Sequence, residues 1–342
     1  MSVLEQPLIR KNISLLRYNT FGVVVTAEYF ATIHTSDDLY ALKETGATAE
    51  HALLIIGKGS NILFTEDFHG LVLHNRIEGI RMIEKTGDEV ILETGSGVEW
   101  DSFVGYCVEH RYYGTENLSL IPGTAGAAAV QNIGAYGVEA ADIILSVTGI
   151  DLHTGEKKSF TNKACRFGYR HSLFKTPALR SFFITSVRFR LSLQPRLNLS
   201  YPQLVRETEH VSHPDILDVR EAVMRVRRSK LPDPEQTGNA GSFFKNPLVS
   251  KEKWETLLAD YPDMPWHALP GDRFKIPAAW LIEQCGWKGK QTGPCATWHR
   301  QPLVIVNLGH ATGKEILDFS RAIQKSVYER FAVFLEPEVL IL

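Results

Sequence analysis

A segment with very few side chains places the strongest constraint on how this chain can fold. Residues 121–137 read IPGTAGAAAVQNIGAYG, and glycine and alanine fill nine of these seventeen positions. Such a segment gains little free energy from burial and loses much backbone entropy when it becomes ordered. It therefore predicts either that a ligand such as a diphosphate approaches this backbone closely, or that the segment packs tightly against a helix.

A second glycine-rich stretch follows an apolar run. ALLII at 52–56 precedes GKGSN at 57–61, where glycines let successive N–H groups converge on an anion and Ser60 and Asn61 add side-chain donors. The dinucleotide motif G-x-G-x-x-G is excluded, because residue 62 is isoleucine and no helix is expected to follow. We expect a strand–loop–strand cradle, with a plain tight turn as the alternative. Two such loops in one half of the chain indicate a dinucleotide-sized cofactor.

Hydrophobic periodicity predicts an α+β fold with many strands. Apolar runs predict strands at 52–56, 71–73, 90–93, 143–152, 182–193 and 303–307, with a hairpin turn near Gly155 and a final strand at 334–342. Helical spacing predicts helices at 36–44 (N-capped by Ser36), 98–110, 215–230, 250–260, 278–285 and 313–330. The helix at 215–230 is stopped by Pro232 and Pro234, and this LPDP indicates a domain boundary.

Charge and composition exclude several classes of function. The 342 residues carry 37 basic and 39 acidic side chains, so nucleic acid is not an expected partner. No run reaches the ~18 apolar residues of a membrane span, and the start MSVLEQPLIRKN lacks the layout of a secretory signal. Four scattered cysteines without a C-x-x-C pair indicate reduced thiols, no metal site and a cytoplasmic location.

The stretch 239–247, NAGSFFKNP, surrounds one serine with small residues and follows it with two aromatics. Glycine at 241 keeps the approach to the Ser242 hydroxyl clear, and Phe243 and Phe244 can anchor the loop and exclude water. The alternative is a turn that runs into a half-buried strand and carries a solvated serine. Hydrolytic chemistry fits poorly, because NAGSF lacks the second glycine of G-x-S-x-G and the chain has no H-E-x-x-H.

Six motifs in order closely resemble the UDP-N-acetylenolpyruvoylglucosamine reductases of bacterial peptidoglycan synthesis: GKGSNILF, IPGTAGAAAVQNIGAYG, CRFGYRHSLFK, KLPDP, GNAGSFFKNP and LEPEV. The resemblance runs from about Asn19 to the C-terminus, and Tyr201 in LSYPQL is similar to the substrate-clamping tyrosine of the family's longer form. It implies a two-lobed FAD-binding unit of the vanillyl-alcohol-oxidase (PCMH) type and a C-terminal α+β substrate-binding domain. It also implies non-covalent FAD, NADPH as electron donor, and reduction of an enolpyruvyl ether to UDP-N-acetylmuramate.

The resemblance assigns three catalytic residues. Ser242 matches the general acid, which protonates the carbon that becomes enolate-like after hydride transfer. Glu338 and Arg170 match the residues around the substrate carboxylate, and we expect Glu336 and Glu338 to share one face of the final strand. Without the resemblance, Glu338 would be an edge-strand charge in solvent and Arg170 a surface salt bridge.

The remaining site predictions concern binding. Substrate contacts are expected from Tyr201, Lys230, Asn246 and Arg227, although the arginines near 227 alone would indicate a solvated helix end. Cofactor contacts are expected from Gly57, Lys58, Gly59, Ser60, Asn61, Pro122, Gly123, Gly126, Asn132 and Gly134. Two departures from the family pattern are Ala127 and Ala128 in place of serines, which leaves contacts there to the backbone, and Pro302, which puts one substrate contact in doubt.

The predicted organisation has four parts: residues 1–194 as the FAD-binding unit with its lobes split near 75, residues 195–231 as the tyrosine loop and connecting helix, residues 232–330 as the substrate-binding domain, and residues 331–342 as the strand that carries Glu338. A monomer is expected. Two alternatives remain open. One is a different FAD-dependent sugar or hydroxy-acid oxidoreductase of the same fold, and the other is a non-catalytic nucleotide-sugar or flavin-binding protein.

Overall fold

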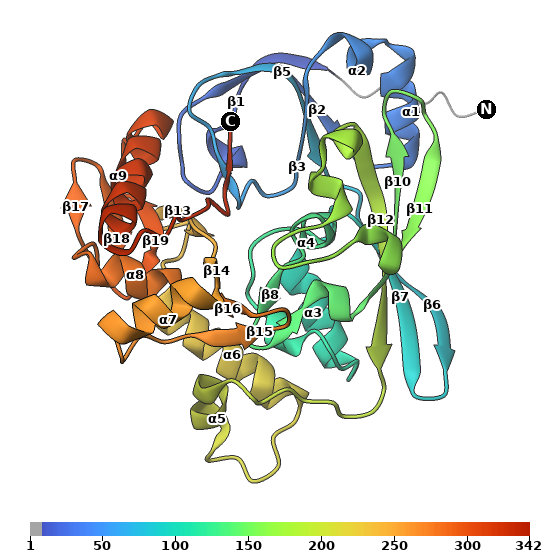
Figure 1. Cartoon of the computed structure of the whole chain (residues 1–342). Coiled ribbons are helices and arrows are strands. Elements are labelled where there is room, and N and C mark those ends of the chain that lie inside the picture. Colours follow the sequence, from blue (N-terminus) through green and yellow to red (C-terminus); the bar gives the residue numbers. More distant parts are fainter. Residues whose placement is uncertain (1–8) are drawn as a thin grey trace. The chain divides into compact units, whose positions relative to one another are not determined.

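The computed structural model describes residues 9–342, which form two compact units (Figure 1). The first eight residues, which are part of the stretch behind the expectation of no secretory signal, lie outside the described residues. The first unit contains the described chain up to Ser14, Thr26–Gly59 and Phe68–Arg227, and the second contains Leu15–Val25, Ser60–Asp67 and Arg228–Leu342. The second unit therefore includes two short segments from the N-terminal part of the chain.

The first unit contains a four-stranded sheet near its start. Its order is β1 (Arg10–Ser14), β2 (Thr26–Ile33), β5 (Phe68–Asn75), β3 (Leu53–Ile56). β2 and β3 run parallel to β5, and β1 is antiparallel to β2. Helices α1 (Ser36–Glu44) and α2 (Ala47–Glu50) connect β2 to β3. The predicted N-cap Ser36 was wrong by one residue, because Thr35 and Asp38 form a reciprocal capping box.

A five-stranded antiparallel sheet completes the core of the first unit. Its order is β11 (Lys157–Thr161), β10 (Ile144–Asp151), β12 (Phe182–Ser192), β7 (Glu89–Gly95), β6 (Ile80–Thr86). The hairpin predicted near Gly155 joins β10 to β11. Helix α3 (Trp100–Glu109) contributes Trp100, Phe103 and Cys107 to a buried cluster with strands β7, β10 and β12. The strands and the helix predicted in this region are thus confirmed to within two residues at most ends.

The glycine- and alanine-rich segment contains a helix that the sequence did not predict. α4 (Ala125–Gln131) lies beside β7 and β12, and β8 (Gly134–Ala135) and β9 (Val138–Glu139) follow it as a small hairpin. Thr124 caps α4 by accepting a hydrogen bond from the amide of Ala127. The small residues of this segment give no apolar periodicity, so the sequence pattern favours a loop here, although Thr124 carries the capping signal.

Two helices end the first unit. α5 (Pro202–Thr208) follows the Tyr201 loop, and α6 (Ile216–Lys230) has the apolar face that was predicted for it. Leu204 packs with Val219, Val223 and neighbouring residues of α6, and Tyr136 lies against this small cluster. The Tyr201 loop is therefore fixed at its base by apolar packing.

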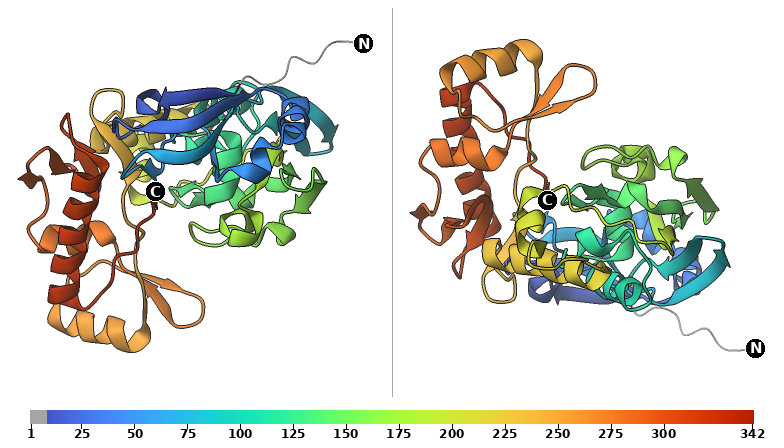
Figure 2. Two further views of the ribbon diagram at one scale, coloured as in Figure 1. Left: turned by 90° about the horizontal axis from the view of Figure 1, so that it is seen from above. Right: turned by 90° about the horizontal axis from the view of Figure 1, so that it is seen from below.

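The second unit contains a four-stranded antiparallel sheet with two helices. Its order is β13 (Gly238–Ser242), β19 (Gln301–Asn307), β18 (Cys295–Trp298), β17 (Gln291–Thr292). Figure 2 shows the long helix α9 (Gly313–Phe331) within this unit, and its contacts are with α8 (Ala278–Gln284), β18 and β19. The predicted apolar face of α9 is buried. A smaller sheet, β14 (Leu248–Ser250), β16 (Arg273–Lys275), β15 (His267–Leu269), packs beside α7 (Lys251–Asp260).

The end of the chain forms much less strand than the sequence predicted. Only β20 (Leu340–Ile341) is a strand, and it runs parallel to β4 (Ile62–Leu63). The segment before it makes one isolated antiparallel bridge, between Pro337 and Phe244. The prediction that Glu336 and Glu338 share a strand face was therefore wrong, because proline lacks the N–H that a continuing ladder needs.

Candidate functional site

A polar pocket lies in the first unit beside the first glycine-rich loop. Its lining residues come from the loop, the end of β5 and the start of α3: Gly57, Lys58, His74, Asn75, Arg76, Glu78, Gly97, Glu99 and Thr124. Two ion pairs cross it, Lys58 with Glu99 and Arg76 with Glu78. All four side chains are about half exposed, so each pair is worth less than about 1 kcal/mol and can exchange for a bound anion.

Protein neighbours explain several of the glycines that the sequence singled out. A Cβ at Gly57 would lie 2.8 Å from the Thr124 side chain, and one at Gly126 would lie 2.9 Å from Cβ of Ser96. The amide of Gly126 also donates to the Ser96 carbonyl at 2.9 Å, so it is already used inside the protein. Tight internal packing, the alternative noted for this segment, therefore accounts for Gly126, whereas Gly59 takes the left-handed conformation (φ +63) that a glycine cradle requires.

Asn132 holds the corner after α4. It is fully buried, its amide nitrogen donates to the Glu139 carboxylate and to the Gly168 carbonyl, both at 2.9 Å, and its oxygen accepts from Ala141. Both amide hydrogens and the oxygen thus have protein partners. The structure supports a structural role for Asn132 rather than the predicted cofactor contact.

His74 was not singled out from the sequence, yet it lines the pocket. Its pKa is lowered from 6.5 to about 4, chiefly by burial and then by the nearby cations Arg76, His34 and Arg10. The imidazole is therefore neutral at pH 7, and the surroundings would accept negative charge. The sequence signal available was the position of His74 and Arg76 at the end of a buried strand next to a glycine-rich loop.

Arg170 also belongs to the first unit, where it is held in an unusual backbone conformation. Its φ is +52, and its guanidinium donates to the carbonyl of Gly134 at 2.7 Å. A Cβ at residue 134 would lie 3.0 Å from a nitrogen of this guanidinium, so glycine there lets Arg170 approach the backbone. The tail of the glycine-rich segment thus positions the arginine that was predicted to be catalytic.

Arg227 is linked to several neighbours within the first unit. The Nε of Arg227 donates to the carbonyl of Leu120 at 3.1 Å, and its guanidinium hydrogen-bonds the hydroxyl of Tyr136. Tyr136 in turn meets Tyr201 edge-to-face, with ring centroids 5.1 Å apart. Burial lowers the pKa of Arg227, and the nearby charge of Arg170 lowers it further. The structure thus brings the predicted residues Arg170, Arg227 and Tyr201 into one region. It adds Tyr136, which was not among the predicted site residues.

Ser242 and Glu338 come together in the second unit. Ser242 is half-buried at the end of β13, and the next residue, Phe243, is fully buried and receives a 2.8 Å hydrogen bond from the amide of Glu338. The amide of Asn61 donates to the Glu338 carbonyl at 3.1 Å. Phe243 and Phe244 lie edge-to-face with centroids 5.0 Å apart, which confirms that they anchor this loop.

The other predicted residues of the second unit have mixed roles. The side-chain oxygen of Asn246 accepts a hydrogen bond of 2.9 Å from the amide of Ala278, the first residue of α8. Burial lowers the pKa of Lys230, which is half-buried. Lys245 was not predicted, yet it pairs with Glu336 at 2.5 Å and helps to hold the segment that carries Glu338. Of the predicted catalytic residues, two belong to the second unit and Arg170 belongs to the first.

Residues 9–342 contain no cluster of three or more histidine, cysteine or acidic side chains that could hold a metal ion. Among the same residues, every helix is too short or too polar to cross a lipid bilayer.

Comparison with known proteins gives consistent matches over nearly the whole chain. A family model described as UDP-N-acetylenolpyruvoylglucosamine reductase, C-terminal domain, matches residues 233–342, and a model described as FAD binding domain matches residues 27–160. A UDP-N-acetylenolpyruvoylglucosamine reductase of Bacteroides fragilis is 46% identical over 95% of this chain and 98% of its own length. One from Porphyromonas gingivalis is 44% identical over 97% and 98%, respectively. The crystal structure of the Thermus caldophilus reductase superposes with a TM-score of 0.66 at 25% identity, covering 98% of this chain and 99% of that one.

Proposed function

Because the chain belongs to the UDP-N-acetylenolpyruvoylglucosamine reductase family, we propose that it reduces the enolpyruvyl ether of UDP-N-acetylglucosamine to UDP-N-acetylmuramate, with NADPH as electron donor and FAD as cofactor. The observation that carries this proposal is 46% identity to a named reductase over 95% of the chain. The FAD requirement that the sequence predicted is confirmed by the match to an FAD-binding domain over residues 27–160.

The first unit fits a diphosphate-bearing cofactor. Its pocket offers two cations, Lys58 and Arg76, together with the backbone of Gly57 and Gly97. Both cations pair with half-exposed carboxylates, which a diphosphate can replace because such pairs are weak. We assign Lys58, the loop glycines, Ser60 and the backbone near Pro122 and Gly123 to cofactor binding.

The chemistry requires one hydride and one proton at adjacent carbons. FAD, when bound and reduced by NADPH, would supply the hydride for the β carbon of the enolpyruvyl group. Negative charge then develops at the α carbon and spreads into the carboxylate, so the protein must stabilise that charge and deliver a proton to one face.

Ser242 is assigned as the proton donor. Its position at the end of β13 is fixed by the two residues that follow it. Phe243 and Phe244 are buried, and the carbonyl of Phe243 accepts a hydrogen bond from the amide of Glu338. Serine is a weak acid, but an enolate-like carbon is a strong base, so the hydroxyl can donate. General acid catalysis of this kind contributes about 10²–10⁴-fold in rate.

Glu338 and Arg170 are assigned to the substrate carboxyl group. A guanidinium forks onto a carboxylate and stabilises the enolate charge that builds there. Arg170 suits this task because the Gly134 carbonyl and the backbone at φ +52 fix the direction of its side chain. Glu338 is held at its amide by Phe243 and at its carbonyl by Asn61.

Tyr201, Arg227, Lys230 and Asn246 are assigned to the nucleotide-sugar, with the diphosphate as the partner of the cationic groups. We further propose that residues 1–194 form the FAD-binding unit, that residues 195–231 form the tyrosine loop and its connecting helix, and that residues 232–330 bind the substrate. We also propose that the enzyme acts as a cytoplasmic monomer.

The test is an anaerobic titration of the purified protein. We expect a yellow protein whose flavin absorbance is bleached by NADPH and restored by the enolpyruvyl substrate. A protein that is bleached by NADPH but not reoxidised by this substrate would be a different oxidoreductase. A colourless protein that takes up no FAD contradicts the proposal altogether.

A further inference from the structure

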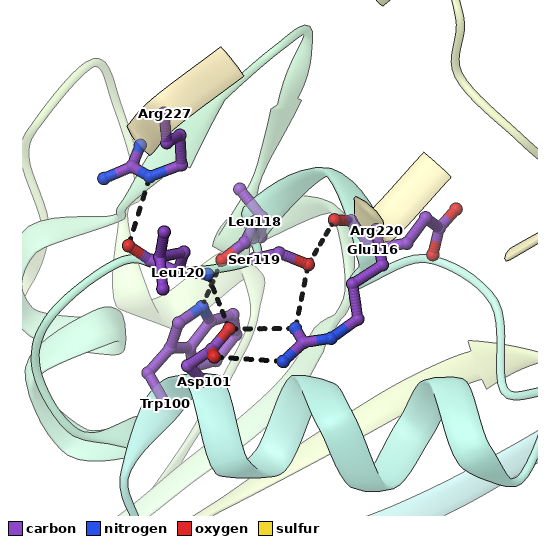
Figure 3. A network of polar contacts seen from close by, with 8 residues as sticks. All are labelled: Trp100, Asp101, Glu116, Leu118, Ser119, Leu120, Arg220 and Arg227. Atoms are coloured by element: carbon purple, nitrogen blue, oxygen red, sulfur yellow. Dashed lines mark hydrogen bonds and ion pairs between the residues drawn. The ribbon is translucent and has the colours of Figure 1, made fainter. Parts of the chain in front are cut away.

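Two arginines of one helix hold the same loop of the first unit (Figure 3). Arg220 and Arg227 are seven residues apart on α6, about two turns, and therefore lie on one face. Arg220 forks onto Asp101 of α3, with nitrogen–oxygen distances of 2.8 and 3.0 Å, and also donates to the hydroxyl of Ser119. Arg227 donates through Nε to the carbonyl of Leu120.

The Asp101 carboxylate links these two contacts. It accepts the amide of Leu120 at 2.5 Å as well as the guanidinium of Arg220. Leu120 has φ +58, a left-handed conformation that leucine rarely adopts and that its surroundings must stabilise. The hydrogen bond from its amide fixes this peptide, and its carbonyl then accepts from Arg227.

The carboxylate is charged and enclosed. Burial alone would raise the pKa of Asp101, but hydrogen bonds from Arg220 and the Leu120 amide lower it below its ordinary value of 3.8. The side chains of Arg220 and Asp101 are only 17% and 24% exposed, unlike most ion pairs of this chain. A bidentate pair at this depth restricts geometry much more than a surface pair does.

Arg227 is held next to a neutral group and a charged one. Its guanidinium hydrogen-bonds the Tyr136 hydroxyl, whose pKa burial raises, so that this partner is neutral. The Asp101 carboxylate stabilises the charge of Arg227 from a distance, but its own hydrogen bonds go to Arg220 and to the amide of Leu120. A guanidinium placed in this way suits an anionic ligand such as a diphosphate.

We propose that the Asp101–Arg220 pair is a positioning element which, through the Leu120 peptide, directs the Arg227 guanidinium toward the diphosphate of the substrate. The inference rests on the proposed function, which supplies the nucleotide-sugar and assigns Arg227 to it. Asp101 and Arg220 act through Leu120 and do not contact the ligand. With Nε held by Leu120, the orientation of the guanidinium plane is fixed, so that a terminal nitrogen not engaged by Tyr136 is directed toward the phosphate oxygens.

The test uses the full chain loaded with FAD and its product, UDP-N-acetylmuramate, as a stable ligand. For Asp101→Asn and Arg220→Gln we expect Kd by calorimetry and KM for the substrate to rise about tenfold, the effect of misaligning one charged hydrogen bond. kcat and FAD content stay within about twofold, because neither residue meets the reacting atoms. The matched control is Glu207→Gln, which breaks the exposed ion pair of Arg225 on the same helix and leaves Kd unchanged.

A double substitution separates positioning from simple stability. Lysine at 227 has no Nε–H with which to reach Leu120, so Asp101→Asn should add no further loss of affinity to Arg227→Lys. A tenfold loss that persists in the Arg227→Lys background overturns the proposal, as does a lower melting temperature with unchanged Kd. Arg220→Lys keeps the positive charge but cannot form the bidentate pair with Asp101. This variant replaces Arg220→Gln in the test if that variant fails to fold. Wild-type protein that binds no product contradicts the proposed function itself.

Discussion

The main-chain amide of Glu338 donates a 2.8 Å hydrogen bond to the carbonyl of Phe243, the residue that follows Ser242. This bond joins two stretches almost one hundred residues apart in the sequence and places the assigned proton donor and the assigned carboxylate on neighbouring backbone. Phe243 is fully buried, so these two backbone segments cannot move apart without disrupting the apolar packing around its ring.

Ser242→Ala removes the assigned proton donor without disturbing that hydrogen bond. We expect reoxidation of the flavin by substrate to slow by about 10²–10⁴-fold, whereas reduction by NADPH keeps its rate. Stopped-flow absorbance measures both steps. Ser250→Ala, which affects only the cap of α7, is the control and leaves both rates near those of the wild type. Equal slowing of both steps in Ser242→Ala would remove Ser242 from the acid role.

Asn61→Ala tests whether Asn61 serves the Glu338 segment or the cofactor. The side-chain amide of Asn61 donates to the Glu338 carbonyl at 3.1 Å, so its loss should loosen that segment by about 1 kcal/mol. We expect substrate reduction to slow by about fivefold at this energy while the Kd of FAD, from fluorescence titration, changes little. A weakened FAD complex with normal substrate reduction would assign Asn61 to the cofactor instead, as the sequence predicted.

Gly313→Ala should destabilise the second unit strongly. A Cβ at this first residue of α9 would lie 1.7 Å from the backbone carbonyl oxygen of Phe64, which cannot move aside as a flexible side chain does. We expect a loss of at least about 3 kcal/mol in the free energy of unfolding by urea. Gly105→Ala is the matched control, because its Cβ would meet only Arg220 at 3.7 Å inside α3. That variant should gain about 0.5–1 kcal/mol.

His74 predicts a specific pH dependence of stability. Folding lowers the pKa of His74 from 6.5 to about 4. Between pH 4 and pH 6.5 the unfolded chain therefore binds a proton at His74 that the folded chain does not bind. This contribution to stability is complete above pH 6.5 and is lost as the pH falls toward 4. The free energy of unfolding is measured by urea denaturation at several pH values and a fixed FAD concentration. Between pH 6.5 and 4 it should fall less in His74→Gln than in the wild type, whereas the exposed variant His210→Gln should match the wild type. Identical pH profiles for wild type and His74→Gln would contradict the prediction.

Elements with strong periodicity were predictable, and those fixed by distant contacts were not. The faces of α6 and α9 followed from apolar residues at helical spacing, and both are buried as expected. α4 was missed because alanine and glycine carry no periodic signal. The final strand was wrong because Pro337 interrupts pairing that the apolar residues around it favour.

The site followed the same rule. Ser242, Glu338 and Arg170 were assigned through motifs, since each lies in a distinctive local sequence. Asn132 looked like a cofactor ligand because it lies in the glycine-rich segment, yet its partners are protein groups that no local pattern reveals. Asp101 and Arg220 are 119 positions apart in the sequence, and the local sequence around one charged residue does not indicate its distant partner.

The pairing of β4 with β20 has a consequence for biosynthesis. Residues 62–63 leave the ribosome long before their strand partner at 340–341, and the carbonyl of Leu342 later accepts a hydrogen bond from the amide of Thr65. The segment 60–67 therefore lacks this strand partner until residues 340–342 have been translated. Separate expression of residues 228–342 would leave β20 with an open edge, so this half should aggregate or need the missing peptide supplied in trans.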